Sequence, residues 1–131
     1  MVVVGASARP GSFGTRLAKA TMSARFPGQI TFVNPRGGEI CGRTALPSLA
    51  DLDHVPDVAV LGVGGANLER ALLDAIAKGA RSAVIFDSCH GETANGHLLL
   101  PRLRAIAAEA DIPVCGGSGM GFINTRSGAV A

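Results

Sequence analysis

Residues 2–14 read VVVGASARPGSFG, and this stretch gives the clearest indication of the fold class. Three consecutive valines predict a strand buried on both faces, because an unbroken apolar run suits the interior of a covered sheet. Gly5 ends the strand, and a helix is expected from 12 to 25, with Ser12 as its N-cap and apolar residues at helical spacing. A strand that turns through glycine into a helix is the opening unit of a parallel α/β sheet.

The rest of the chain repeats this alternation. Further strands are predicted at 30–33, 58–61, 83–86 and 112–115, and further helices at 67–78 and 97–110. The order predicts an α/β fold: a Rossmann-like, doubly wound, mainly parallel sheet of about five or six strands flanked by helices.

Details of the helices and of one less regular segment can also be predicted. Asn67 is expected to cap the second helix and Gly79 to end it. Pro101 requires that the third helix either begins near Leu100 or is kinked, because proline fits only the first turn. In the segment 36–56 we expect a short strand near 41–45 and a turn of helix near 48–52.

Composition limits the class of protein. The 131 residues suit one domain, residues 1–131, and a content of 47% hydrophobic and 17% charged residues excludes intrinsic disorder. A net charge of +2 and few aromatic residues argue against nucleic acid, and no apolar run is long enough for a membrane span. Three cysteines without a CxxC pair favour a cytoplasmic protein with reduced thiols, and no spacing matches zinc ligands. The tail 124–131 is expected to trail off, and the chain to be a fragment of a longer protein.

The loop after the first strand is the strongest functional signal. Small residues at 5–14 let a ligand approach the backbone, and the helix that follows presents free N–H groups to an anion. The spacing matches neither the dinucleotide fingerprint nor the Walker A motif. Phosphate binding is nevertheless favoured, because doubly wound folds bind ligands at this position.

The end of the second strand narrows the choice of ligand. Domains that bind NAD place an acidic residue there, whereas this chain has Asn34, followed by Pro35 and Arg36. Arg36 offers a cation for a phosphate on a ribose, which NADP carries at the 2′ position and coenzyme A at the 3′ position. Both ligands remain open at this point.

Taken together, the motifs resemble the CoA-binding domain of NDP-forming acyl-CoA synthetases, which are relatives of the succinyl-CoA ligase alpha subunit and of ADP-forming acetate–CoA ligases. The resemblance extends over residues 1–125 and is carried by several motifs in the family's order. They are VVGAS (3–7), PGSFG (10–14), VNPR (33–36), LPSLADL (46–52) and DVAVL (57–61).

The resemblance implies a binding site for coenzyme A. Residues 7–10 would contact its pyrophosphate or adenosine, Arg36 would supply the cation, and residues 86–88 would form a CoA-contacting turn. Residues 116–124 match a turn near the reacting end of CoA. The expected cofactor-binding residues are Gly5, Ser7, Ala8, Arg9, Pro10, Gly11, Gly14, Asn34, Arg36, Phe86, Asp87 and Ser88.

The chain departs from the family at three places. Gly117, Ser118 and Gly119 replace a Pro-Asn-Cys run, Asp87 introduces an acid into the CoA-contacting turn, and 64–65 has two glycines where proline is frequent. Asp87 is unsuited to a phosphate, but its carboxylate can accept a hydrogen bond from a hydroxyl or from a pantetheine amide. These changes imply either altered acyl specificity or a relative without catalysis.

The resemblance implies the CoA-binding domain of an acid–CoA ligase, which exchanges acyl-CoA, ADP and phosphate with acid, CoA and ATP. The chain would hold CoA, while phosphohistidine and nucleotide-grasp domains complete the reaction with an acyl-CoA or carboxylic acid. Two alternatives are a non-catalytic, regulatory CoA-binding module and, less favoured, an NADP-dependent oxidoreductase domain.

No catalytic residue is assigned within the chain. His54 and His97 are expected to be ordinary polar histidines. Cys89 and His90 follow a strand, but adjacent side chains on an extended turn usually point apart, so a nucleophilic pair is not expected. Cys115 is expected to pack within its strand, and Cys41 to act as a small apolar residue.

Overall fold

The computed structural model describes residues 1–23, 26–126 and 128–130. Its central element is a five-stranded parallel sheet in the order β2-β1-β5-β6-β7, made of β1 (Val2–Val4), β2 (Thr31–Val33), β5 (Ala59–Leu61), β6 (Ala83–Ile85) and β7 (Val114–Cys115). The chain winds from β1 to β2 in one direction and from β5 to β7 in the other. The predicted doubly wound fold is therefore confirmed.

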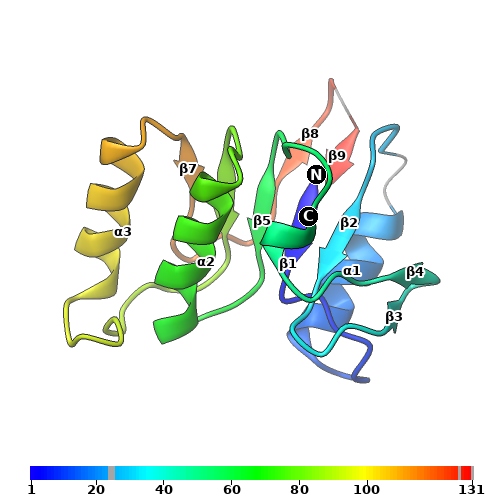
Figure 1. Cartoon of the computed structure of the whole chain (residues 1–131), viewed down its shortest axis with the longest axis horizontal. Helices are drawn as coiled ribbons and strands as arrows, with labels where there is room; N and C mark the ends of the chain where they lie inside the picture. Colours follow the sequence, from blue (N-terminus) through cyan, green and yellow to red (C-terminus); the bar gives the residue numbers. More distant parts are fainter. Residues whose placement is uncertain (24–25, 127, 131) are drawn as a thin grey trace.

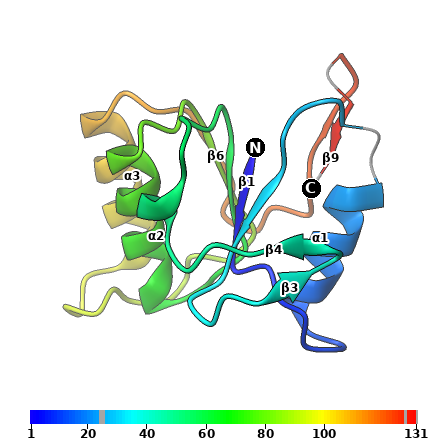
Figure 2. The ribbon, with the colours of Figure 1, turned by 45° about the vertical axis from the view of Figure 1, so that its right-hand side comes forward.

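Three helices cover the two faces of this sheet. They are α1 (Phe13–Ser23), α2 (Ala66–Ala77) and α3 (Leu99–Glu109). In Figure 2, α2 and α3 lie on one side of the sheet and α1 on the other. Because strand side chains alternate between faces, the valines of β1 divide between two cores: Val2 and Val4 pack toward α2, and Val3 packs toward α1.

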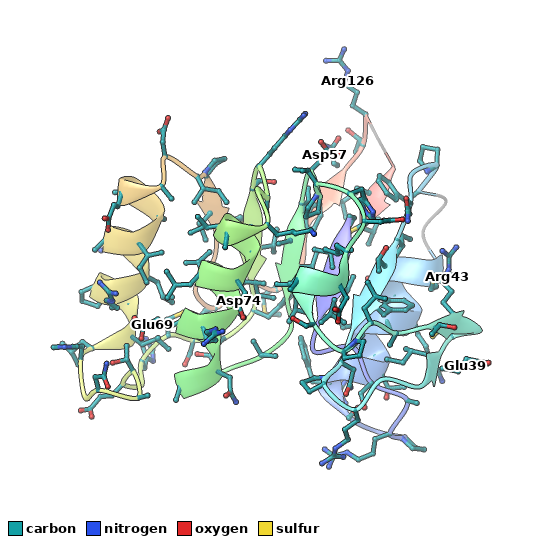
Figure 3. All side chains as sticks on the ribbon, in the orientation of Figure 1. Glu39, Arg43, Asp57, Glu69, Asp74 and Arg126 are labelled. Atoms are coloured by element: carbon teal, nitrogen blue, oxygen red, sulfur yellow. The ribbon has the colours of Figure 1, made fainter. Side chains whose placement is uncertain are left out.

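Smaller elements cover the β2 edge of the sheet on both faces: Ile40 of a hairpin joins the core on the α1 side, and Leu49 of a short helix joins the core on the α2 side. Along the chain, β2 is followed by a hairpin made of β3 (Glu39–Ile40) and β4 (Arg43–Thr44). The 3-10 helix η1 (Leu49–Asp51) comes next, before β5. Figure 3 shows the hairpin side chains Glu39 and Arg43 at the right-hand edge of the molecule. The strand predicted near 41–45 is thus the second half of a hairpin, and the helical turn predicted near 48–52 is confirmed.

The helix boundaries confirm some predictions and correct others. Ser12 accepts a hydrogen bond from the N–H of Thr15, as an N-cap should, and Gly79 has the positive φ of +83° expected after α2. The prediction that Asn67 caps α2 is wrong. The helix begins at Ala66, so Asn67 lies in its first turn, and the N-cap position is held by Gly65, which has no side chain to bond the helix. Pro101 lies in the first turn of α3, where its missing N–H has no cost.

In the tail predicted to trail off, the described residues 124–126 and 128–130 are ordered into strands and turns instead, and residues 127 and 131 lie outside the described residues. Strands β8 (Ile123–Asn124) and β9 (Ala129–Val130) form an antiparallel pair behind β1 and β2, on the side of α1 (Figure 1). Ala129 is buried in the core between the sheet and α1. Two short strands without aromatic or alternating residues give no recognisable pattern, which is why the sequence did not predict this hairpin.

Two cysteine predictions are also wrong. Cys41 is exposed at the tip of the β3–β4 hairpin, with φ +50°, because Cys41 and Gly42 are the central residues of a turn that needs two positive φ angles. Cys115 is exposed because β7 is an edge strand.

Within the described residues, no helix has both the length and the apolar character needed to cross a membrane.

Candidate functional site

The winding direction reverses between β1 and β5, so the carboxyl ends of these strands flank the crevice where open α/β sheets bind ligands. The loop 5–12 closes one side of this crevice and leads into α1. Gly5 and Gly14 allow the close approach: a Cβ on Gly14 would lie 2.2 Å from the Gly5 carbonyl oxygen. Only glycine lets the first turn of α1 sit directly on the end of β1.

Side chains of α1 hold this loop in shape. The Thr15 hydroxyl lies 2.8 Å from the Ser7 carbonyl oxygen and 2.9 Å from the Ser12 hydroxyl. The Arg16 guanidinium donates to the Gly11 carbonyl oxygen over 2.8 Å. The Ser7 hydroxyl accepts from the N–H of Arg9 over 3.0 Å. The roles of Thr15 and Arg16 could not be predicted from the sequence, because helical periodicity places both residues only on the polar face of a helix.

Asn34 joins this loop to the turn after β2. Its amide nitrogen donates to the Ala6 carbonyl oxygen over 2.7 Å, and its amide oxygen accepts from the N–H of Arg36 over 2.9 Å. Arg36 is exposed, as is Arg9 in the neighbouring loop. The structure therefore places the two predicted segments that carry Arg9 and Arg36 next to each other at the carboxyl ends of β1 and β2, and the hydrogen bonds of Asn34 connect them.

The predicted site residues at the end of β6, residues 86–88, lie beside the first residue of α1, Phe13, which follows the loop 5–12. The rings of Phe13 and Phe86 pack edge to face, with centroids 5.6 Å apart, and the Arg16 guanidinium lies 5.9 Å from the centroid of Phe13. Beside these rings is a cavity of about 310 Å³, here called the aromatic cavity. Its lining residues are Phe13, Gly62, Val63, Gly64, Phe86 and Asp87.

A second cavity of about 310 Å³ lies on the α2 side of the same strand ends. It is lined in part by Gly5, Val33, Pro35 and Pro47. The two cavities flank the end of β1, so the crevice offers apolar walls on both sides of the loop that presents the α1 N-terminus. The helical spacing identified Phe13 only as the first apolar residue of a helix, and no pattern in the sequence indicated that Phe13 or Val63 would line a cavity.

Asp87 is committed to the protein itself. One carboxylate oxygen accepts from the N–H of Cys89 over 2.7 Å, the other from the N–H of Gly65 over 3.2 Å, and the Asp87 carbonyl accepts from the N–H of Ser118 over 2.7 Å. Asp87 therefore connects three loops at the carboxyl edge of the sheet. Its carboxylate lies at the start of α2, where the helix dipole favours a negative charge.

The close approach of Asp87 explains the two glycines at 64–65. A Cβ on Gly64 would lie 2.2 Å from an Asp87 carboxylate oxygen, and Gly65 has φ +56°. The carboxylate and the paired glycines are therefore one structural feature, since the acid needs the space that the glycines leave.

The Cys89–His90 pair is not arranged as a nucleophile and base. Cys89 is buried, whereas His90 is exposed. Burial raises the pKa of the Cys89 thiol, and the Asp87 carboxylate raises it further, so the thiol form is favoured at neutral pH.

The parallel sheet, the crevice at its switch point and the loop that presents a helix N-terminus define a Rossmann-like domain of the type that binds phosphate-bearing ligands. Residues 1–125 match the model of a family described as CoA binding domain, and the chain belongs to this family.

Curated relatives agree with this family. The chain is 29% identical over 126 residues to an ADP-forming acetate–CoA ligase of Methanocaldococcus jannaschii, covering 96% of this chain and 18% of that protein. It is 29% identical over 125 residues to a trans-feruloyl-CoA synthase of an unknown prokaryotic organism, covering 95% of this chain and 18% of the relative. The chain thus spans about a fifth of the length of the curated relatives it matches.

Solved structures have the same fold. A dinucleotide-forming acetyl-coenzyme A synthetase of Ca. Korarchaeum cryptofilum, solved with phosphate and ADP, superposes with a TM-score of 0.81 at 26% identity. The match covers 98% of this chain and 28% of that one. A Pyrococcus horikoshii protein superposes with a TM-score of 0.83 at 24% identity, over 98% of this chain and 30% of its own.

Proposed function

We propose that this domain holds coenzyme A as the thiol substrate of an acid–CoA ligase of the NDP-forming class. The observation that carries the proposal is the family match over residues 1–125, which supports coenzyme A as the ligand, and the switch-point crevice supports the location that we propose for it. The ligase activity is the one named for the acetate–CoA ligase relative, and its other domains would lie outside residues 1–131.

The diphosphate of CoA would lie against residues 5–14. The loop contributes the N–H groups of the first turn of α1 and the exposed guanidinium of Arg9, which together favour an anion. Ser7, Ala8, Pro10, Gly11 and Gly14 would bring the backbone close to the phosphates rather than donate side-chain bonds. This role suits their small size and the hydrogen bonds that already hold the loop.

Arg36 would bind the 3′-phosphate of the ribose. Asn34 fixes the backbone of Arg36 next to the loop, and no carboxylate among the described residues lies within ion-pair distance of its guanidinium. A phosphate could therefore pair with Arg36 without breaking an existing ion pair. Charge-assisted bonds of this kind are worth roughly 1.5–3 kcal/mol each.

The pantetheine arm would cross the aromatic cavity beside Phe13 and Phe86. The rings offer an apolar wall for its methylene and methyl groups, and the turn 86–88 would border its path. Both carboxylate oxygens of Asp87 already accept hydrogen bonds from backbone N–H groups. We therefore propose that Asp87 fixes the loops that form the cavity wall and does not bond directly to a hydroxyl or amide of CoA.

The proposed reaction converts acyl-CoA, ADP and phosphate to acid, CoA and ATP, or the reverse. In it this domain would orient the CoA thiol, while phosphohistidine and nucleotide-grasp domains carry the phosphoryl group. A cytoplasmic location with reduced thiols accords with such a reaction and is part of the same proposal.

A binding measurement with three ligands tests the proposal. Calorimetric titration should give binding of CoA, roughly ten-fold weaker binding of dephospho-CoA, and no difference between the two in an Arg36→Ala variant. Arg43→Ala, on the β3–β4 hairpin, is the matched control and should keep the difference. Binding of NADP in preference to CoA would support the oxidoreductase alternative and contradict the proposal.

A regulatory module remains a second candidate, and one observation favours it. The 116–119 turn lacks an amide side chain, and the N–H of Ser118 is already bonded to Asp87, so this turn offers few groups to a reacting thioester. An acyl-CoA phosphorolysis assay on the full-length protein separates the candidates: a ligase forms ATP from acyl-CoA, ADP and phosphate, and a regulatory module does not.

A further inference from the structure

A separate cavity lies at the opposite edge of the sheet from Arg36. It has a volume of about 200 Å³ and lies between α3 and the carboxyl ends of β6 and β7. Figure 1 shows α3 and β7 together on the left-hand side of the molecule, away from β1 and β2. We call it the edge cavity, and its walls include Ile85, Cys89, Leu100, Leu103, Ala107 and Val114.

The walls of the edge cavity are almost entirely apolar. Five of the wall residues are aliphatic, and Gly116 and Gly117 add no side chain. The one cysteine contributes a thiol that donates to the Asp87 carbonyl, so it makes no demand on a ligand. An apolar cavity of about 150 Å³ already holds a benzene molecule, so this one suits an aromatic ring or a short hydrocarbon chain.

A single charged side chain also lines this cavity. Arg104 of α3 is exposed, and none of the ion pairs among the described residues involves it, although its neighbour Arg102 pairs with Glu69 over 2.7 Å. A cation beside an apolar chamber matches a ligand with an apolar body and one negative group. A carboxylate is the group that a guanidinium binds with two parallel hydrogen bonds.

We infer that the edge cavity binds a small monocarboxylic acid, with the apolar body among the α3 and β7 side chains and the carboxylate on Arg104. The inference deepens the proposed function, because the acid would be the acid substrate of the proposed ligase. The cavity lies at the carboxyl ends of strands two and three positions from β1, about 10–14 Å away at the usual strand spacing. An extended pantetheine arm anchored at β1 can cover such a distance.

Benzoate is the probe, and benzyl alcohol is its neutral counterpart. Both would be titrated into the 131-residue chain with ¹³C-labelled methyl groups. We expect saturable shifts at the methyl groups of Leu100, Leu103 and Val114, with benzyl alcohol binding about two- to five-fold more weakly, as an exposed ion pair allows. Arg104→Gln should remove this preference, and Arg81→Gln should keep it.

Filling the cavity gives a second test with a matched control. Ala107→Leu places a larger side chain in the cavity and should weaken benzoate binding at least ten-fold. Ala108→Leu makes the same change on the exposed side of α3 and should leave binding unchanged. Equal binding by these two variants, or the absence of saturable shifts at the cavity methyl groups, would overturn the inference.

Calorimetry with CoA on the same variants keeps the two proposals distinct. We expect Ala107→Leu to retain CoA binding within about two-fold. If CoA binds and benzoate does not, the edge-cavity inference fails and the proposed function stands. If benzoate binds and CoA does not, the cavity is an acid site and the proposed function fails.

Discussion

Removing the Asp87 carboxylate should loosen two segments at once, the turn 87–89 and the start of α2, while the Asp87 carbonyl keeps its bond to Ser118. In Asp87→Ala, the N–H groups of Cys89 and Gly65 lose acceptors at 2.7 and 3.2 Å. Hydrogen bonds to a charged group contribute roughly 1.5–3 kcal/mol each, and the longer bond to Gly65 belongs at or below the low end. Since Asp87 is half-buried and water can replace part of the loss, we expect a destabilisation of about 2–3 kcal/mol.

Thermal unfolding measures this loss. For a domain of this size the expected decrease in Tm is roughly 8–12 °C. Asp87→Asn keeps an acceptor oxygen for the shorter bond and should lose about half as much. Asp57→Ala is the control, because the carboxylate of Asp57 pairs with Arg81 over 3.3 Å with both side chains about 77% and 76% exposed. Its effect should stay within about 0.5 kcal/mol.

Binding adds a second measurement to the same variants. If Asp87 holds the wall of the aromatic cavity, Asp87→Ala should weaken CoA binding at a temperature where the variant is still folded, whereas Asp57→Ala should not. Equal Tm values for Asp87→Ala and Asp57→Ala would refute the claim that this carboxylate connects the loops.

Three further predictions concern the helix contact, a thiol and the last strand. Gly14→Ala should destabilise the fold by about 2 kcal/mol or more in urea denaturation, because the new Cβ would lie 2.2 Å from the Gly5 carbonyl oxygen. Gly11→Ala should cost only about 1 kcal/mol, because nothing lies within 4 Å of its Cβ and only its φ of +74° is unfavourable. Cys89 should resist iodoacetamide at pH 7.5, while the exposed Cys41 and Cys115 react. Because the folded state raises the pKa of the Cys89 thiol, this group stabilises the fold fully below the unfolded thiol pKa of about 8.5. That stability is lost as the pH rises through the higher folded pKa. Equal labelling of the three thiols in intact-protein mass spectrometry would contradict this. Deleting residues 126–131 removes β9 and the buried Ala129 and should lower Tm by several degrees, although the family match ends at residue 125; an unchanged Tm would show that β9 adds nothing.

The sequence predicted the sheet because its strands are uninterrupted apolar runs. Val2–Val4 and Ala83–Ile85 are buried on both faces, and such runs have few alternative structures. The order of these runs and the helices between them then predicted a doubly wound, mainly parallel sheet, and the structure adds the strand order. Pro101 and Gly79 set helix boundaries correctly because each restricts the backbone in a specific way.

The remaining features depend on contacts between distant residues. The start of α2 at Ala66 and the β8–β9 hairpin follow from tertiary packing, for which the local sequence gives no sign. In the site, Asn34 was expected beside the ligand, but the structure also gives it the task of joining two loops. Asp87 accepts hydrogen bonds from the N–H groups of Gly65 and Ser118, which lie 22 and 31 positions away in the sequence, and periodicity cannot reveal such bonds.

The proposed function depends above all on the binding of coenzyme A in the crevice between β1 and β5. The most direct measurement is a titration of the ¹⁵N-labelled chain with CoA, followed by amide shifts in a ¹H–¹⁵N correlation spectrum. We expect saturable shifts for residues 5–14, for Arg36 and for the lining of the aromatic cavity, with little change on the exposed face of α3. CoA-induced shifts confined to other surfaces, or their absence, would contradict it.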